Sequence, residues 1–303
     1  MIKRFCKLSV AIFLCWAISK FCHSQTQGFQ TVKIVSHLLP SSQWETPLVS
    51  EADMARLQAI FSQPFSYFGS GGQSYAFLSQ DGQVVLKLFK MHNVRQYPFL
   101  YRVSLPGALD LPRVAFLHWQ RKKLKRVFSS SHLAFTELKD ISGLLFLNLN
   151  PSPAFEELKI TLIDNLGIEH LLDLSKIPFA LQYRADRLLS TLRFHLLHKD
   201  LGSCQKIIKN VVACLKARYQ KGISDVDPAV RRNIGLLKDR AISIDIGSFF
   251  HSPHLLPKEE LMKDTRRLRK WLNRRSPPLA AYLDALINEG DNSQELEISQ
   301  SHH

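Results

Sequence analysis

The chain has 303 residues, of which 45% are hydrophobic, and its low glycine and proline counts exclude a disordered or collagen-like protein. Its length allows one large or two modest domains with a real core. The net charge of +14 indicates acidic partners such as nucleotides or anionic lipid, with solubility as the plain alternative. The sequence has no zinc-type Cys/His spacing, RNA-binding aromatic signature or internal repeat, so we expect no nucleic-acid partner.

The first 24 residues have the layout of a secretory signal peptide. Basic residues precede an apolar run at residues 8–19, and Cys22-His23-Ser24 follows as a small-x-small triplet. The run is shorter than the about 20 residues that a membrane-spanning helix needs. We therefore expect residues 1–24 to be a cleaved signal peptide or an uncleaved signal anchor, and we rank a buried N-terminal helix third.

A glycine-rich turn lies between two apolar, strand-like runs. The turn reads Gly69-Ser70-Gly71-Gly72-Gln73-Ser74, and the run that follows, residues 84–89, contains Lys87. Glycines let the backbone approach an anion closely and leave N–H groups that point at it. A lysine inside an apolar strand needs a partner for its charge. Together the turn and Lys87 predict a phosphate cradle, with an ordinary hairpin turn as the alternative.

Apolar spacing predicts the remaining elements of the body. The first half reads as a mostly antiparallel sheet with an inserted helix, and serines at residues 129–131 are expected to cap a break in that helix. The second half reads as helical around one short hairpin. The predicted elements are a strand at 31–35, helices at 51–61, 113–128 and 131–141, strands at 158–163 and 169–174, helices at 186–199 and 203–221, strands at 234–237 and 241–244, and helices at 259–275 and 279–287.

Lys87 needs a carboxylate to orient it if it binds a nucleotide. Glu137, on the inserted helix, is the best-placed candidate, with Glu156 and Glu157 as rivals. Two basic runs, residues 121–126 and the helix at 259–275, are interpreted first as solvated helix faces. Their alternative interpretation is a surface for an anionic membrane or an acidic substrate.

The short hairpin brings together residue types that bind magnesium. Asn233 stands at its start, Asp245-Ile246-Gly247 at its end, and Asp227 on the loop that leads into it. One amide and two carboxylates on converging loops predict a hard-oxygen metal site with a base. The alternative is that Asp225 and Asp227 are turn or helix-cap residues and that Asp245 caps a strand end.

In this order, the motifs resemble those of the protein-kinase-like superfamily over roughly residues 65–250. Gly69 and Gly71 match the first two glycines of the family's loop, with Ser74 in place of the third, and Val85-Leu86-Lys87 is similar to its Val-Ala-Ile-Lys strand motif. Asp227 falls at the catalytic aspartate. Asn233 falls at the magnesium-binding asparagine and Asp245-Ile246-Gly247 at the Asp-Phe-Gly motif.

Three departures accompany the resemblance. Asp225 replaces the usual histidine two residues before the catalytic aspartate, and the interval from Asp227 to Asn233 is one residue longer than the family pattern. Only 56 residues follow Gly247, and they contain no Ala-Pro-Glu motif. The resemblance therefore implies an atypical bacterial kinase, or a pseudokinase, with a reduced C-lobe.

The resemblance implies an α+β, bilobal fold with an antiparallel-sheet N-lobe and a mainly helical, shortened C-lobe. We expect an N-terminal extension at residues 25–55, the N-lobe at 56–180, the C-lobe at 181–288 and a disordered tail at 289–303. The implied function is ATP- and Mg²⁺-dependent transfer of phosphate to a hydroxyl of a protein, lipid or sugar. The alternative is a catalytically impaired pseudokinase that acts as an exported or membrane-associated binding module.

The resemblance also implies roles for single residues. Lys87 would bind the α- and β-phosphates, pair with Glu137 and assist catalysis. Asp227 would orient or deprotonate the acceptor hydroxyl, and Asn233 and Asp245 would hold Mg²⁺. The other nucleotide contacts would come from the loop and from a hinge, namely Gly69, Ser70, Gly71, Gly72, Ser74, Ala180 and Gln182.

The export signal and the use of ATP are in tension, because the periplasm contains little nucleotide. The leader could be an anchor that leaves the domain with access to ATP, the protein could be secreted into a host cell, or the domain could no longer catalyse. We expect an exported or membrane-associated protein and a monomer, and the sequence leaves these three resolutions open.

Overall fold

The fold is described by a computed structural model. It describes residues 2–46, 50–94, 100, 103, 106–107, 110–152, 155 and 158–300. The chain divides into two compact units, which are considered separately. The sheet unit comprises Met1–Leu124 and Asn148–Leu181, and the helical unit comprises Lys125–Leu147 and Gln182–His303. The domain ranges expected from the sequence stay a prediction.

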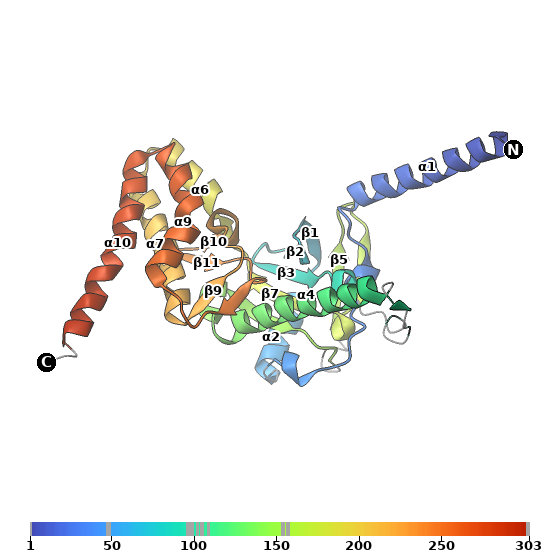
Figure 1. Ribbon diagram of the computed structural model, residues 1–303, viewed down its shortest axis with the longest axis horizontal. Coiled ribbons are helices and arrows are strands. Elements are labelled where there is room, and N and C mark those ends of the chain that lie inside the picture. Colours follow the sequence, from blue (N-terminus) through green and yellow to red (C-terminus); the bar gives the residue numbers. More distant parts are fainter. Residues whose placement is uncertain are drawn as a thin grey trace. The chain divides into compact units, whose positions relative to one another are not determined.

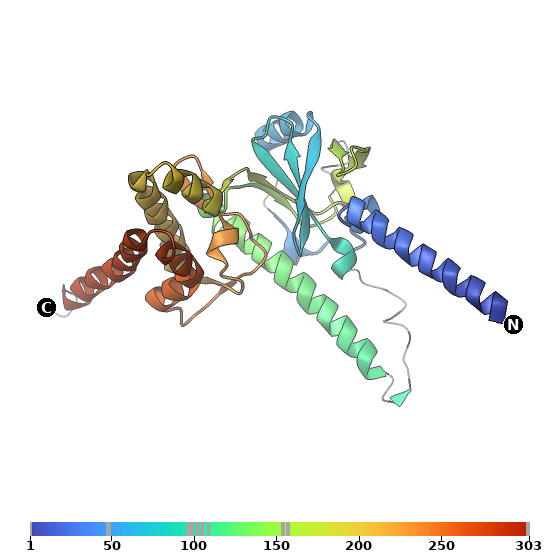
Figure 2. The ribbon, with the colours of Figure 1, turned by 90° about the horizontal axis from the view of Figure 1, so that it is seen from above.

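The sheet unit is built on a mixed sheet in the strand order β4-β7-β3-β2-β1-β5-β6. Neighbouring β1, β2 and β3 are antiparallel, as are β5 and β6, but β1 and β5 run parallel. The unit boundary falls within β4 and β7. Figure 2 shows the β1–β3 meander in blue to teal. The strands are β1 (Phe65–Ser70), β2 (Ser74–Ser79), β3 (Val84–Phe89), β4 (Leu144–Asn148), β5 (Lys159–Ile163), β6 (Glu169–Asp173) and β7 (Phe179–Tyr183).

An aromatic core fixes this sheet against the segments before it. Phe61, at the end of α2 (Glu51–Phe61), packs against Phe65 and edge-on against Phe179. Phe29 makes edge contacts with Tyr75 and Phe77 on β2. Edge-to-face aromatic pairs add to the stabilisation from burial alone. The core therefore holds β1 and β2 rigidly up to the turn that joins them.

The first helix, α1 (Ile2–Gln25), exposes its apolar side chains, including Phe13 and Trp16. It is labelled at the N-terminal end in Figure 1. Among the described residues, no helix combines the length and the apolar character that crossing a membrane requires.

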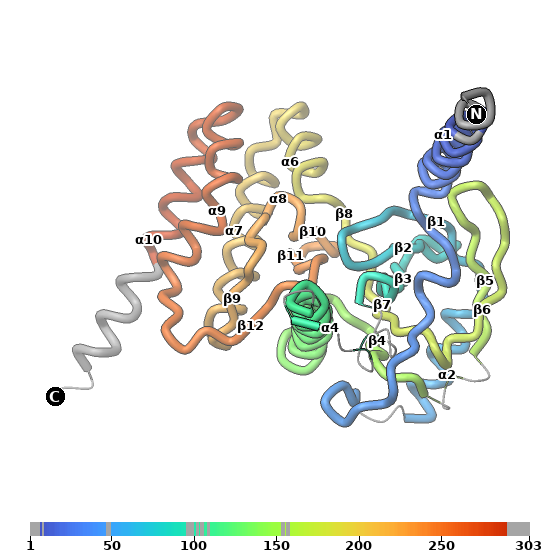
Figure 3. Tube along the Cα trace, turned by 45° about the vertical axis from the view of Figure 1, so that its right-hand side comes forward, coloured from blue at the N-terminus to red at the C-terminus, as the bar shows by residue number. Residues whose placement is uncertain are grey.

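The helical unit buries one continuous apolar core. The stripe of α7 (Leu201–Gln220), including Ile208, Val211 and Leu215, packs in one cluster with Leu268 of α9 and Leu283 of α10. Figure 3 shows α7, α9 and α10 side by side. The other helices are α5 (Lys139–Ser142), α6 (Leu188–Leu197), α8 (Val230–Asn233), α9 (Pro257–Asn273) and α10 (Pro277–Gln300), and α4 (Asp110–Thr136) contributes residues to both units.

The helical unit also contains short strands that lie between its helices in the sequence. β10 (Ile234–Leu237) pairs with β11 (Arg240–Ser243) and with β8 (Asp186–Arg187), and β12 (Phe249–His251) pairs with β9 (Ile223–Asp225). All three of these pairings are antiparallel. The predicted hairpin is confirmed, and each of its ends is tied to a second short sheet or helix.

Several local predictions were wrong for identifiable reasons. Residues 31–33 form a 3-10 helix rather than a strand. The expected serine break is absent because Ser131 Oγ donates to Val127 O at 2.9 Å inside a continuous α4. Two strands, β4 and β7, were missed. Helix α10 continues to Gln300, and the expectation of a disordered tail at residues 289–303 stays a prediction.

Candidate functional site

The predicted phosphate loop is the turn of the β1–β2 hairpin. Gly69 and Ser70 end β1, Ser74 begins β2, and the N–H of Gly71 donates to Ser74 O at 2.9 Å. The register shifts between Tyr67 and Gly69, so β1 carries an irregularity just before the turn. The sequence therefore folds locally into a tight turn held by one backbone hydrogen bond.

The fold does not require glycine at this turn. Gly69, Gly71 and Gly72 all lie outside the left-handed region. A Cβ at Gly69 or Gly72 would meet nothing within 4 Å, and one at Gly71 would meet only Ser74 O at 3.8 Å. Packing of the chain thus leaves these three glycines unexplained. Open space over a glycine backbone is what close approach of a phosphate needs.

Lys87 lies on β3, opposite Ala76 of β2. It is half-buried in a strand whose other residues are buried. Lys87 thus lies on the predicted strand at residues 84–89, and β2 stands between that strand and the glycine turn in the sequence. The role of Lys87 toward nucleotide phosphates stays a prediction.

A second lysine on the sheet unit, Lys90, contacts the glycine turn directly. Its Nζ donates to Ser70 Oγ at 2.7 Å and to Gly71 O at 2.6 Å, and it lies 4.5 Å from the centre of the Tyr75 ring. Burial, with the nearby positive charges of Lys33 and Lys123, lowers the pKa of Lys90. The sequence reasoning missed Lys90. The signal for it was its place directly after β3, three residues beyond Lys87.

The predicted hinge residues lie on β7. Ala180 and Gln182 are both buried. In the helical unit, Gln182 Nε2 donates to the carbonyls of Ser142 and Ser243, the latter at 3.0 Å. The side chain of Gln182 therefore holds β11 to the end of α5. Contact of either residue with adenine stays a prediction.

The helical unit joins Asp227, Asn233 and the residue before Asp245 through hydrogen bonds. Asn233 Nδ2 donates to Asp227 O at 2.8 Å, while Asn233 O accepts from the N–H of Ile244 at 2.7 Å. Asn233 is buried, whereas Asp227 and Asp245 are exposed. Asn233 thus binds the Asp227 segment through its side-chain amide and the segment before Asp245 through its backbone carbonyl.

The residues after Asp245 are fixed as well. The N–H of Gly247 donates to Asp245 Oδ1 at 3.2 Å. Ser130 of α4 donates from its Oγ to Ile246 O at 2.5 Å and accepts from the N–H of Phe249 at 2.6 Å. Ser130 of α4 therefore anchors the segment that follows Asp245.

Asp225 is the buried centre that links the two loops. Its Oδ1 accepts from the N–H of Asp227 at 2.9 Å and from Ser248 Oγ at 2.5 Å. Its Oδ2 lies 3.7 Å from Arg218 Nη1. Burial raises the pKa of Asp225 to about 6, against the opposing effects of Ser248 and Arg218. Asp225, which stands in place of the histidine of the kinase-like pattern, therefore links the Asp227 loop to the segment after Asp245.

A buried ionic group lies beneath Asp225. Arg218 Nη2 donates to Asp264 Oδ2 at 2.5 Å, and Tyr219 OH donates to the same oxygen at 2.6 Å. The side chains of Arg218 and Asp264 are 4% and 0% exposed, so their charges are withdrawn from water. A buried arginine with two carboxylates around it supports Asp225 from the side opposite to Asp227.

Glu137 follows the last residue of α4. Its Oε1 lies 3.0 Å from His251 Nε2, and its carbonyl accepts from Lys221 Nζ. The predicted pairing of Glu137 with Lys87 joins two units that are considered separately, so it stays a prediction. Glu156 and Glu157 lie outside the described residues. That Lys87 faces one cleft with Asn233 and Asp245 also stays a prediction.

The candidate metal ligands suit magnesium bound together with a nucleotide. In the described part of the chain, no group of three or more His, Cys, Asp and Glu side chains is arranged to hold a metal ion. Asn233 and Asp245 would supply one amide oxygen and one carboxylate. Mg²⁺ is commonly held by one or two carboxylates plus substrate phosphates rather than by a full protein cage. The donor types therefore fit a nucleotide-dependent Mg²⁺ ion.

Comparison with known proteins found no matching family model and no matching curated protein. Among solved structures, the chain is similar to two of the bifunctional kinase-methyltransferase WbdD, at 13% and 14% identity with TM-scores of 0.35 and 0.36. The matches cover 76% and 79% of this chain and 47% and 50% of WbdD.

A third similar structure is the complex of Rv3197 with erythromycin from Mycobacterium tuberculosis, at 14% identity and a TM-score of 0.34, covering 79% of this chain and 61% of that one. The chain spans about half to three fifths of the length of these similar structures.

Proposed function

We propose that the protein has a kinase-like, bilobal fold and transfers a phosphoryl group from Mg²⁺-ATP to a hydroxyl of a protein, lipid or sugar. The observation that carries this proposal is the bonding of Asn233, which ties Asp227 on one side and the Asp245 segment on the other. A base and a metal ligand held by one buried amide are what phosphoryl transfer requires of a protein.

The chain's residues would divide the work as follows. Gly69, Gly71 and Gly72 admit the phosphates to the backbone of the turn, and Lys87 binds the inner phosphates. Asn233 and Asp245 are the ligands for Mg²⁺. When bound, Mg²⁺-ATP supplies the γ-phosphoryl group and the neutralisation of its charge.

Asp227 acts on the acceptor. Its carboxylate accepts the proton of the acceptor hydroxyl as that oxygen bonds to the γ-phosphorus, and the bond from the γ-phosphorus to the bridging oxygen breaks to release ADP. Asp227 is exposed, and its Oδ2 lies 3.6 Å from Arg232 Nη2. An exposed carboxylate beside a solvated arginine is accessible to an acceptor hydroxyl.

ADP release and thermal shift together test this proposal. We expect Mg²⁺-ATP to raise the melting temperature of the wild-type protein, with no shift in Lys87→Ala or Asp245→Asn. Asp227→Asn should still bind nucleotide but lose phosphate transfer by about 10²-fold or more. Asp239→Asn, an exposed aspartate on the same hairpin paired with Lys206, is the matched control and should behave as wild type. Wild-type protein without a thermal shift would contradict the proposal.

A binding module without catalysis is the second candidate, and Lys90 favours it. Lys90 Nζ already donates hydrogen bonds to Ser70 Oγ and Gly71 O, so the chain itself supplies a cation to the turn. For this candidate we expect a thermal shift with nucleotide and no ADP release. Transfer that Asp227→Asn abolishes would reject it.

We further propose that the protein is a monomer that is exported, secreted into a host cell or associated with a membrane through residues 1–24. The apolar side chains of α1 are exposed, which supports a leader that is either cleaved as a signal peptide or inserted into a membrane as an anchor. Fractionation of cells with mass spectrometry of the N-terminus tests this proposal. A chain that stays in the soluble cell fraction with residues 1–24 intact would contradict it.

A further inference from the structure

A cavity of about 280 Å³ in the helical unit is lined almost wholly by cations. Its lining residues are Arg231, Arg267, Lys270, Trp271, Arg274 and Arg275. Arg231 comes from α8 and the others from α9 and the turn after it, and α8 packs against α9. Five positive charges around one hollow repel one another, and the repulsion is relieved only by a bound anion or by solvent.

The chain provides no counter-ion for this cavity. No carboxylate is among its lining residues. Within the described residues, none of the five cations takes part in an ion pair, although Arg275 lies 4.5 Å from the centre of the Trp271 ring. The cation–π contact orients Arg275 without neutralising it.

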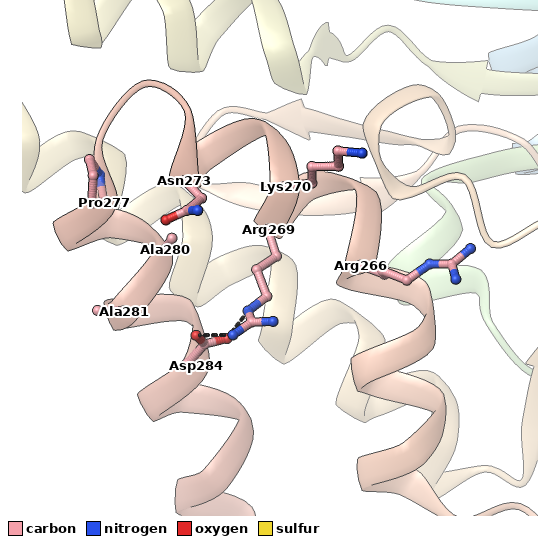
Figure 4. Close-up of a pocket in the computed structure, with 8 residues that line it drawn as sticks. All are labelled: Arg266, Arg269, Lys270, Asn273, Pro277, Ala280, Ala281 and Asp284. Carbon is pink, nitrogen blue, oxygen red and sulfur yellow. Dashed lines mark hydrogen bonds and ion pairs between the residues drawn. The ribbon is translucent and has the colours of Figure 1, made fainter.

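The neighbouring cavity on the other side of α9 is an internal contrast. It measures about 420 Å³, and its wall contains Asp284, which lies 2.6 Å from Arg269 Nε. Figure 4 shows Arg269 reaching across to Asp284 of α10, while Lys270 and Arg266 point elsewhere. One cation there is neutralised by the fold itself. Lys270 of α9 lines both cavities, and the difference between them is that only the larger one has a carboxylate in its wall.

We propose that the cavity lined by Arg231, Arg267 and Arg274 binds a small molecule that carries two or more phosphate groups. Guanidinium groups bind phosphate oxygens in pairs, and five cations match a ligand of several negative charges. The cavity size lies at the lower end for small-molecule sites. The inference concerns binding alone and does not rest on the proposed phosphoryl transfer.

The lining favours a soluble ligand over a lipid surface. Its sole apolar member is Trp271, which is 6% exposed. Docking on a bilayer uses apolar side chains that insert beside the cations. A cavity whose one aromatic ring is already buried offers no such anchor.

Inorganic pyrophosphate is the probe, titrated calorimetrically without Mg²⁺ or nucleotide into the full chain. Lys87→Ala serves as the background, so that the glycine turn does not contribute. We expect saturable binding that Arg267→Gln with Arg274→Gln weakens by about tenfold or more. Arg269→Gln, on the same helix but paired with Asp284, is the matched control and should leave affinity within about twofold.

Each outcome is informative. Binding that survives Arg267→Gln with Arg274→Gln, or no binding at all, overturns the proposal. Retention of anionic vesicles that is lost in the same double variant, without pyrophosphate binding, overturns it in favour of a membrane surface. Asp245→Asn should bind pyrophosphate normally, so loss of phosphate transfer and loss of this site are separate results. Circular dichroism checks that each variant is folded.

Discussion

The glycines of the β1–β2 turn and those of the helical unit differ in what their surroundings demand. A Cβ at Gly235 would lie 2.8 Å from Ala185 Cβ and 2.9 Å from Ile244 Cγ2, and one at Gly143 would lie 2.7 Å from Ile242 Cδ1 at a φ of +63°. At Gly72 nothing lies within 4 Å. Packing therefore explains glycine at Gly143 and Gly235, whereas no contact within the chain explains it at Gly72.

The same contrast holds for charges. In the helical unit, Asp225 and Asp264 are buried around Arg218 and hold the Asp227 loop from within. In the sheet unit, the turn is exposed at Gly71 and Gly72, and the half-buried Lys90 donates a hydrogen bond to Gly71 O. One region is preorganised by burial, and the other is left adaptable to a ligand.

The largest effect should come from Asp264→Ala. It leaves the buried Arg218 charge without its closest partner, which costs about 3–5 kcal/mol of folding free energy. Urea denaturation followed by circular dichroism measures it. The exposed Asp239→Ala should leave the denaturation midpoint unchanged. An Asp264→Ala midpoint equal to that of wild type would mean that Arg218 is not dependent on this carboxylate.

The next largest effect should come from Gly235→Ala, which overpacks β10 against β8 and β11. The expected cost is about 1–3 kcal/mol. Since Asn233 and Ile244 flank this contact, the variant should also weaken any Mg²⁺-dependent nucleotide binding. Thermal unfolding with and without Mg²⁺-ATP measures both effects. A fully stable variant would show that the hairpin can shift without strain.

Sequence patterns predicted local elements and missed the long-range side-chain contacts that stabilise them. The turn, the position of Lys87 on β3 and the β10–β11 hairpin follow from short-range spacing, so they could be predicted. The pairing of Arg218 with Asp264 could not, because these residues lie 46 positions apart in the chain. The serines in α4 led to a wrong prediction of a helix break, because a hydroxyl that can cap a helix can also donate to a backbone carbonyl one turn earlier in the same helix.

A smaller effect concerns pH and Asp225. Burial raises the pKa of this carboxyl to about 6 in the folded state, above its value in an unfolded chain. The folded state therefore holds the proton more tightly, and this group's stabilising contribution is present at low pH and is lost as pH rises toward 6.

Asp225→Asn should remove that contribution, changing the slope of stability against pH between about pH 4 and 6 by roughly 1 kcal/mol per unit. Urea denaturation across this range measures it. Asp200→Asn is the control, because serine hydrogen bonds lower the pKa of that exposed carboxyl. An Asp225→Asn variant that keeps the wild-type slope would show that Asp225 stays ionised.

The smallest effect on stability should come from Gly72→Ala. The added methyl meets no atom within 4 Å and needs no unusual φ, so we expect the unfolding free energy to change by less than about 0.5 kcal/mol. Nucleotide affinity should nonetheless fall, because the methyl occupies the space through which a phosphate approaches the backbone. Thermal shift with Mg²⁺-ATP separates the two readouts, and Gly235→Ala is the matched change in the packed region. If Gly72→Ala binds nucleotide as tightly as wild type does, the open turn is an ordinary hairpin turn, and its lack of packing contacts has no role in nucleotide binding.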